Sequence, residues 1–148
     1  EFIDNAIISS LKIKADIVQK DEKESGLRKI LNFGHTIGHS IEILSDFEIS
    51  HGRAVGIGMA IETSISEKIG ILKSEDKERI FQLLKKSKLL DISFKTSADK
   101  IIKKTILDKK TRKGVVEYSL IKGIGNAVYG IKVEDEIVKE SLAEAEFL

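Results

Sequence analysis

The three histidines of the chain, His35, His39 and His51, lie close together in the sequence, and each stands next to a glycine. His35 and His39 are four residues apart, so a helix places them on one face, near enough to share a ligand. Imidazole nitrogens bind Zn²⁺ readily, and a catalytic zinc site uses about three protein ligands and leaves one position open. Spacing alone leaves three interpretations open: a metal site, a catalytic pair, or structural histidines.

Two further polar residues precede this pair at helical intervals. Arg28 lies four residues before Asn32, and Asn32 lies three residues before His35. One helix over residues 27–44 would therefore align Arg28 and Asn32 with His35 and His39. Such a stripe faces either solvent or an anionic ligand. A solvated stripe is usually rich in lysine and glutamate, so this composition favours the ligand.

The apolar pattern predicts the elements that must hold these residues. Apolar spacing near 3.6 residues indicates helices over residues 1–18, 27–44, 51–70, 74–87 (with Ser74 as N-cap), 97–107 and 134–145. The third of these helices contains several glycines, each costing about 1 kcal/mol relative to alanine. Close approach of a helix or a ligand would justify that cost, as would a buried central position.

The last third of the chain carries a different pattern. β-branched and aromatic residues flank glycine-containing turns at Lys113–Gly114 and Gly123–Asn126, which is typical of a hairpin or ribbon. No linker or repeat interrupts the chain. The predicted fold class is therefore mainly α: one helical domain over residues 1–148 with a small β-hairpin near its C-terminal end.

The charge balance argues against a nucleic-acid-binding protein. Charged residues make up 33% of the chain, but the formal net charge is only +1. Runs such as "KDEKE" lie among apolar residues at helical spacing and are typical of solvated helix faces. No apolar stretch approaches the roughly 18 residues that span a bilayer. Because cysteine is absent, disulfides and thiolate ligands are excluded. We expect a cytoplasmic protein with neither nucleic-acid nor membrane partners.

Two segments, "KADIVQKDEKESGLRKILNFGHTIGHSIE" and "HGRAVGIGMAIE", resemble the 3-dehydroquinate synthase family, and "LDKK" at residues 107–110 resembles a later element of that family. The resemblance implies the helical C-terminal domain, which binds metal and substrate. The family's NAD-binding N-terminal domain and a third metal ligand, a glutamate, precede this stretch and are absent from the chain. We therefore expect one domain of a two-domain enzyme, inactive when expressed alone.

The resemblance also implies a reaction and a set of site residues. 3-Deoxy-D-arabino-heptulosonate 7-phosphate becomes 3-dehydroquinate and phosphate, with NAD⁺ and Zn²⁺ or Co²⁺ as cofactors. The implied partners are this sugar phosphate, the enzyme's own N-terminal domain and a second subunit of a homodimer. By motif position, the metal ligands are His35 and His51, the catalytic residues are His39 and Glu24, and the substrate-binding residues are Lys14, Arg28, Asn32, Lys109 and Lys110, with one of the last two making the contact.

One position departs from the family. Arg53, in "HGRAV", stands where the family usually has an acidic residue, two residues after His51. Lys14 is, by periodicity alone, an ordinary surface lysine.

Three other functions stay open: another sugar-phosphate cyclase, a metal-dependent polyol or alcohol dehydrogenase, and a helical binding module without catalytic activity.

Overall fold

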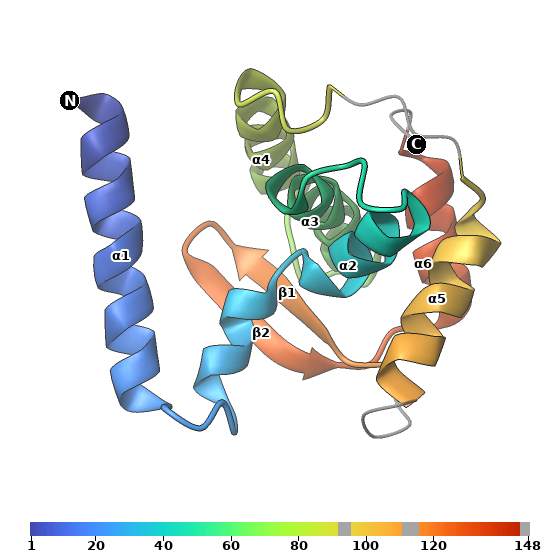
Figure 1. Ribbon diagram of the computed structural model, residues 1–148, viewed down its shortest axis with the longest axis horizontal. Coiled ribbons are helices and arrows are strands. Elements are labelled where there is room, and N and C mark those ends of the chain that lie inside the picture. Colours follow the sequence, from blue (N-terminus) through green and yellow to red (C-terminus); the bar gives the residue numbers. More distant parts are fainter. Residues whose placement is uncertain (92–95, 111–115, 146–148) are drawn as a thin grey trace.

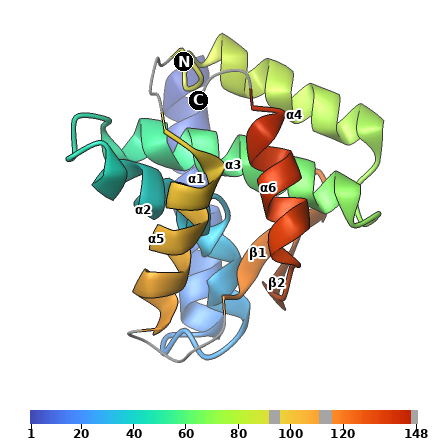
Figure 2. The ribbon, with the colours of Figure 1, turned by 90° about the vertical axis from the view of Figure 1, so that its right-hand side faces the viewer.

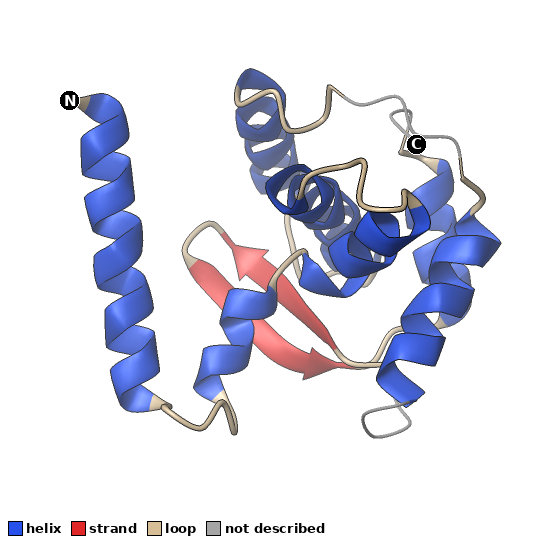
Figure 3. Cartoon of the chain, viewed as in Figure 1, coloured by secondary structure: helices blue, strands red, loops and turns tan. Residues whose placement is uncertain are grey.

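The chain forms a mainly helical domain with a small antiparallel hairpin near its C-terminal end (Figure 1 and Figure 3), which confirms the predicted fold class. The computed structural model describes residues 1–91, 96–110 and 116–145, without the side chains of residues 2 and 108–110. In chain order the elements are α1 (Phe2–Lys20), the 3₁₀-helix η1 (Leu27–Asn32), α2 (His35–Leu44), α3 (His51–Lys68), α4 (Ser74–Lys86), α5 (Ala98–Lys110), β1 (Tyr118–Gly123), β2 (Asn126–Ile131) and α6 (Asp135–Ala143).

Helix α3 is the centre of the domain. It packs against α2, α4, α6 and β1, and it runs through the middle of the helical body (Figure 2). Helix α5 completes the core by packing against α2 and α6. Isoleucines dominate this core, and those of α2 and α3 that are at most 1% exposed are Ile37, Ile41, Ile57, Ile61 and Ile65. Burying the inner faces of α2 and α3 together positions the two segments that carry the histidines.

The glycines allow α2 and α3 to approach closely. A Cβ atom at Gly58 would lie 1.9 Å from the carbonyl oxygen of Gly34 and 2.8 Å from the nitrogen of Gly38. A Cβ atom at Gly38 would lie 2.9 Å from the carbonyl oxygen of Ala54. These are backbone atoms, which cannot move away as a flexible side chain could. The close approach of another helix therefore explains why α3 tolerates Gly58.

The single helix predicted over residues 27–44 is wrong. The structure has η1 up to Asn32 and starts α2 at His35, with Gly34 between them at φ 81°. A right-handed helix cannot continue through this left-handed conformation, which glycine adopts at little cost. The continuous polar stripe from Arg28 to His39 is therefore also wrong, although the helical spacing of His35 and His39 is retained.

The other predicted elements agree with the structure to within a few residues at each end. One exception is Ser74, which is the first residue of α4 and not its N-cap. Its hydroxyl donates a hydrogen bond to Glu67 Oε1 at 2.8 Å, while Lys73 takes the cap position without a side-chain bond. The predicted turn at residues 123–126 joins β1 to β2. The predicted turn at residues 113–114 lies outside the described residues.

Helix α1 stands apart from the helical body and packs mainly against η1 (Figure 1). Its apolar side chains are largely unburied, with exposed fractions of 49–70% for Ile3, Ile7, Ile8, Leu11 and Ile13. Such a row of apolar side chains is typical of a surface that packs against another protein segment. Among the described residues, no helix has the length and apolar character needed to span a bilayer.

The substitution Gly58→Ala tests the contact between α2 and α3. Its Cβ atom would overlap backbone atoms of α2, so the two helices must separate. Overpacking of this kind costs about 1–3 kcal/mol, and we expect at least that loss in the free energy of unfolding measured with urea. Gly52→Ala on the same helix is the control, because no heavy atom other than those of its chain neighbours and the local helix backbone lies within 4 Å of its Cβ position. Equal destabilisation by both substitutions would contradict the proposed close contact.

Candidate metal and substrate site

The three histidines come together where α2 and α3 begin. His35 is the first residue of α2, His39 lies one turn later, and His51 is the first residue of α3. Their ring centroids are 5.4 Å apart for His35 and His39, 5.4 Å for His35 and His51, and 5.7 Å for His39 and His51. His35 is partly buried, whereas the other two are exposed. The packing of α2 on α3 thus gathers all three imidazoles at one surface.

Hydrogen bonds determine which nitrogen of two rings is available. His35 Nδ1 lies 3.3 Å from the carbonyl oxygen of Phe33, and His51 Nδ1 lies 3.1 Å from Glu42 Oε2. A carbonyl oxygen only accepts hydrogen bonds, and an ionised carboxylate does the same. The hydrogen of each neutral ring therefore sits on Nδ1, and Nε2 keeps its lone pair. His35 and His51 can both offer Nε2 to a ligand.

The cluster fits a divalent metal ion. One ring nitrogen from each histidine can be chosen so that all three atoms lie within 4.8 Å of one another. Two nitrogens bound to the same zinc ion at about 2.1 Å can be no more than about 4.2 Å apart. Small rotations of the exposed rings bring the atoms into that range. Borderline metals such as Zn²⁺ and Co²⁺ suit imidazole ligands, so the donor set is compatible with either ion.

A buried carboxylate fixes the start of α2. Glu62 of α3 is fully buried, and its oxygens accept the backbone N–H of Gly34 at 2.6 Å and of Ile37 at 3.3 Å. Helix N-termini leave such N–H groups without partners inside the helix, and they carry the positive end of the helix dipole. Burial raises the pKa of the nearby Tyr118 hydroxyl, and the charge of Glu62 raises it further. This capping bond determines where His35 lies.

A second carboxylate organises the turn between α1 and η1. Asp21 accepts hydrogen bonds from the backbone N–H of Ser25, Gly26 and Arg28 at 2.8–3.0 Å. These bonds, above all the one from Arg28, lower the pKa of Asp21 from 3.8 to about 2. The Arg28 side chain also donates from Nη1 to the carbonyl oxygen of Glu22 at 2.9 Å. Arg28 is therefore held at both its backbone and its side chain.

Glu24 and Asn32, predicted as catalytic and substrate-binding residues, contact each other directly. Asn32 Nδ2 donates to Glu24 Oε1 at 2.7 Å, and Glu24 adopts the left-handed φ of 54°. Both residues line a cavity of about 220 Å³ between η1, the start of α2 and the hairpin. The other residues lining it are Lys29, Thr36, Glu117, Tyr118, Ser119 and Gly130. One of these lining residues, Thr36, directly follows His35 in the sequence.

Other predicted residues are not brought to this cluster by any contact within the described part of the chain. The Lys14 side chain is exposed on α1 and makes no hydrogen bond or ion pair with the described residues. The Arg53 side chain is exposed in the first turn of α3 and likewise has no partner among the described residues. Lys109 and Lys110 end α5, and their side chains lie outside the described residues.

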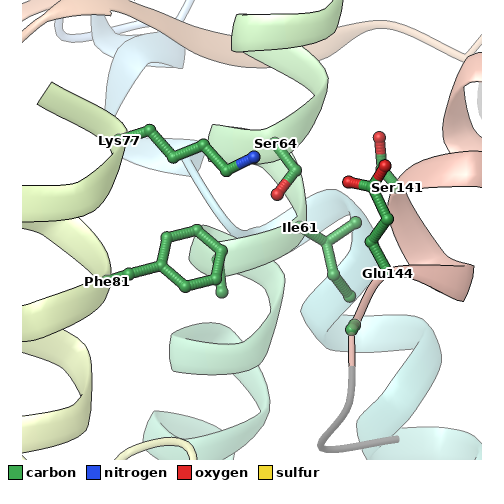
Figure 4. A pocket seen from close by; sticks show the side chains of 8 residues that line it. Ile61, Ser64, Lys77, Phe81, Ser141 and Glu144 are labelled. Carbon is green, nitrogen blue, oxygen red and sulfur yellow. The ribbon is translucent and has the colours of Figure 1, made fainter. Parts of the chain in front are cut away.

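A second cavity lies between α3, α4 and α6 (Figure 4). Its volume is about 80 Å³. Lys77 lines it but already pairs with Glu67, and this contact lowers the pKa of the Glu67 carboxyl. None of the predicted site residues lines this cavity. The histidine cluster and the cavity lined by Glu24, Asn32 and Thr36 are therefore the candidate site.

Residues 1–111 match the family described as 3-dehydroquinate synthase C-terminal. The chain belongs to this family. It is 41% identical over 141 residues to the 3-dehydroquinate synthase of Rippkaea orientalis, a match that covers 94% of this chain and 38% of that protein. The predicted family is confirmed. The chain spans well under half the length of this 3-dehydroquinate synthase.

Solved structures of sugar-phosphate cyclases share the fold of this chain. A 2-deoxy-scyllo-inosose synthase complexed with carbaglucose-6-phosphate, NAD⁺ and Co²⁺ superposes with a TM-score of 0.79 at 28% identity, over 88% of this chain and 38% of that one. The 2-epi-5-epi-valiolone synthase of Streptomyces hygroscopicus, with NAD⁺ and Zn²⁺ bound, gives 0.77 at 25% identity, over 88% and 36%. Both relatives therefore bind NAD⁺ and a divalent metal.

Two residues that contact the candidate site, Glu42 and Glu62, were not identified by the sequence analysis. Glu42 contacts His51, and the available signal was its position three residues after His39, on the same helical face. Glu62 caps α2, and the signal was a carboxylate in the otherwise apolar and small-residue stretch 54–66 of α3. Neither signal identifies the contact partner, because both partners come from another helix.

We expect Glu62→Gln to destabilise the domain by about 1–3 kcal/mol. Glutamine has one acceptor oxygen and one donor group, so one of the two backbone N–H groups loses its acceptor. Urea unfolding measures the change. The control is Glu75→Gln, an exposed residue of α4 whose side chain has no partner in the described part of the chain. It should change stability by less than about 0.5 kcal/mol, and a similar small change at Glu62 would refute the capping role.

The lowered pKa of Asp21 predicts that the stability of the domain depends on pH. Its ionised form accepts the three backbone bonds, so its contribution is complete above pH 3.8 and is lost as the pH falls towards 2. Asp21→Asn should therefore lower the urea midpoint at pH 6, and the difference from the unsubstituted protein should shrink as the pH falls from 4 towards 2. A difference that stays constant over this range would contradict the lowered pKa.

Proposed function

We propose that this chain is the metal- and substrate-binding domain of a 3-dehydroquinate synthase. The enzyme converts 3-deoxy-D-arabino-heptulosonate 7-phosphate to 3-dehydroquinate and phosphate, a step in the synthesis of aromatic amino acids. One observation carries the proposal: three imidazoles converge at the starts of α2 and α3 in a chain of this family, and the first turn of α2 also contributes Thr36 to a polar cavity lined by Glu24 and Asn32. The relatives that carry this name share about 40% identity with the chain.

The histidines divide into two roles in this proposal. His35 and His51 hold the metal through Nε2, since Nδ1 of each ring already has an acceptor. A bound Zn²⁺ or Co²⁺ polarises a hydroxyl or carbonyl oxygen of the substrate. His39 is exposed and its ring lies within 6 Å of both others, which suits a group that takes or gives a proton. A glutamate of the preceding domain provides the third ligand.

The remaining residues bind the substrate. Asn32 and Glu24 face the cavity together, and their mutual hydrogen bond orients the amide so that its oxygen can accept from a substrate hydroxyl. Arg28 uses one of its five N–H donors on the Glu22 carbonyl, so most of its planar fork is available for a carboxylate. Lys14 and either Lys109 or Lys110 provide positive charge for the phosphate or carboxylate.

The proposal assigns NAD⁺ to a separate preceding domain. The matched relatives are more than twice as long as this chain, which leaves room for such a domain. The exposed apolar side chains of α1 support a contact with it, because they lack a covering element among the described residues. We also propose that the complete enzyme is a homodimer and acts in the cytoplasm.

A second candidate is a sugar-phosphate cyclase that makes a different ring. The solved relatives with this fold include an inosose synthase and a valiolone synthase. Arg53 favours this candidate, because it replaces a usual acidic residue two positions after His51 and adds positive charge next to the site. Product identity distinguishes the two candidates. A dehydrogenase or a non-catalytic module is disfavoured by the retained anion-binding residues.

The test is phosphate release by the natural full-length protein, with NAD⁺ and Zn²⁺ or Co²⁺, in the presence and absence of a chelator. We expect chelator-sensitive release accompanied by 3-dehydroquinate. His35→Ala and His51→Ala should each lower kcat/KM by about 100-fold or more, because the metal contributes several kcal/mol to the transition state. Lys122→Ala, at an exposed position of β1 that does not line the cavity, is the control.

Two outcomes would contradict the proposal. A folded, metal-loaded, NAD⁺-bound protein that releases no phosphate from this substrate would favour the second candidate. Retention of full activity in both histidine variants would contradict the proposal that His35 and His51 bind a metal ion. The 148 residues expressed alone should show no turnover, and substantial turnover would contradict the assignment of NAD⁺ to a separate domain.

A further inference from the structure

Glu42 contacts a histidine of the cluster, His51, through a hydrogen bond. Its Oε2 atom lies 3.1 Å from His51 Nδ1. The Glu42 side chain is 19% exposed, whereas that of His51 is 55% exposed. Glu42 therefore sits on the inner side of the pair, at the protein end of the imidazole. It belongs to α2, so it links that helix to the first residue of α3.

The contact determines how the His51 ring is presented. An ionised carboxylate accepts hydrogen bonds and cannot donate them, so it selects the tautomer of His51 with hydrogen on Nδ1. The backbone carbonyl of Phe33 selects the same tautomer in His35. The two rings consequently expose the same nitrogen, Nε2, although they stand on different helices. A free histidine side chain would rotate and exchange its tautomers.

We propose that Glu42 is a positioning residue, which orients His51 for metal binding and increases the electron density on its Nε2 atom. This inference rests on the metal site of the proposed function. Glu42 acts through His51 and is not a ligand itself: the group that could hold a metal in the described part of the chain comprises the three histidines without Glu42. Carboxylates that accept from a metal-binding histidine commonly have this role.

A purely structural role is the competing explanation. Glu42 also connects α2 to the start of α3, so its removal could loosen the domain without any specific effect on His51. The two roles differ in what restores function. A glutamine at this position keeps an acceptor oxygen for Nδ1–H but loses the charge, whereas an alanine removes the acceptor. A positioning role therefore predicts that glutamine rescues much of what alanine loses.

The experiment measures the Co²⁺ dissociation constant of the natural full-length protein by competition with a chelator. We expect Glu42→Ala to weaken Co²⁺ binding by about 10- to 100-fold, and Glu42→Gln to weaken it by only a few-fold. Glu48→Ala is the matched control, since it removes an exposed carboxylate from the same segment that has no side-chain partner among the described residues. Urea midpoints in the presence of chelator should be similar for all four proteins.

The outcomes distinguish the proposed metal site from the proposed role of Glu42. If the unsubstituted protein does not bind Co²⁺, the proposed metal site is wrong, and this inference with it. If it binds Co²⁺ and Glu42→Ala binds equally well, the metal site stands and the positioning role is overturned. Equal weakening in the alanine and glutamine variants would also overturn it, because an acceptor oxygen would then have no effect. Graded weakening at similar urea midpoints supports it.

Discussion

The buried carboxylate of Glu62 is the contact on which the site depends. It accepts backbone hydrogen bonds from Gly34 and Ile37, so it fixes where α2 begins and in which direction the helix leaves the turn. A buried charge is costly unless hydrogen bonds satisfy it, and here backbone donors at a positive helix end do so. The close contact of Gly58 with Gly34 adds a steric constraint at the same place. Together they place His35 opposite the start of α3.

The resulting site combines rigid and adjustable parts. His35 and His51 each begin a helix, and each has its Nδ1 atom held by an acceptor on α2 or just before it. The two helix N-termini give this surface a positive potential that favours an anionic substrate. The carboxylates of Glu42 and Glu24 offset that potential where a metal cation and substrate hydroxyls are proposed to bind. The imidazole rings of His39 and His51 remain exposed, so they can adjust when an ion binds.

Much of the fold follows from local patterns. Apolar periodicity, polar corners and the turn at residues 123–126 identify the helices and the hairpin, because each of these signals acts within a few residues. The prediction of one helix over residues 27–44 failed at residues 33–34 for a different reason. A glycine inside an apolar run is compatible with a helix, and Gly34 breaks it because Glu62, which is distant in the sequence, takes up the backbone N–H groups. The Ser74 cap failed for a similar reason, since Glu67 accepts its hydroxyl.

The sequence by itself determined the fold class, the family and the identity of the residues that could do chemistry, because helical spacing and ungapped motifs are local properties of the chain. Tertiary structure alone decided which residues meet. It brought His51 to within reach of His35 and His39, paired Asn32 with Glu24, and left Lys14 on a helix that stands apart. It also revealed Glu42 and Glu62 as partners of the site. Such contacts join separate elements, and their geometry depends on how those elements pack against one another.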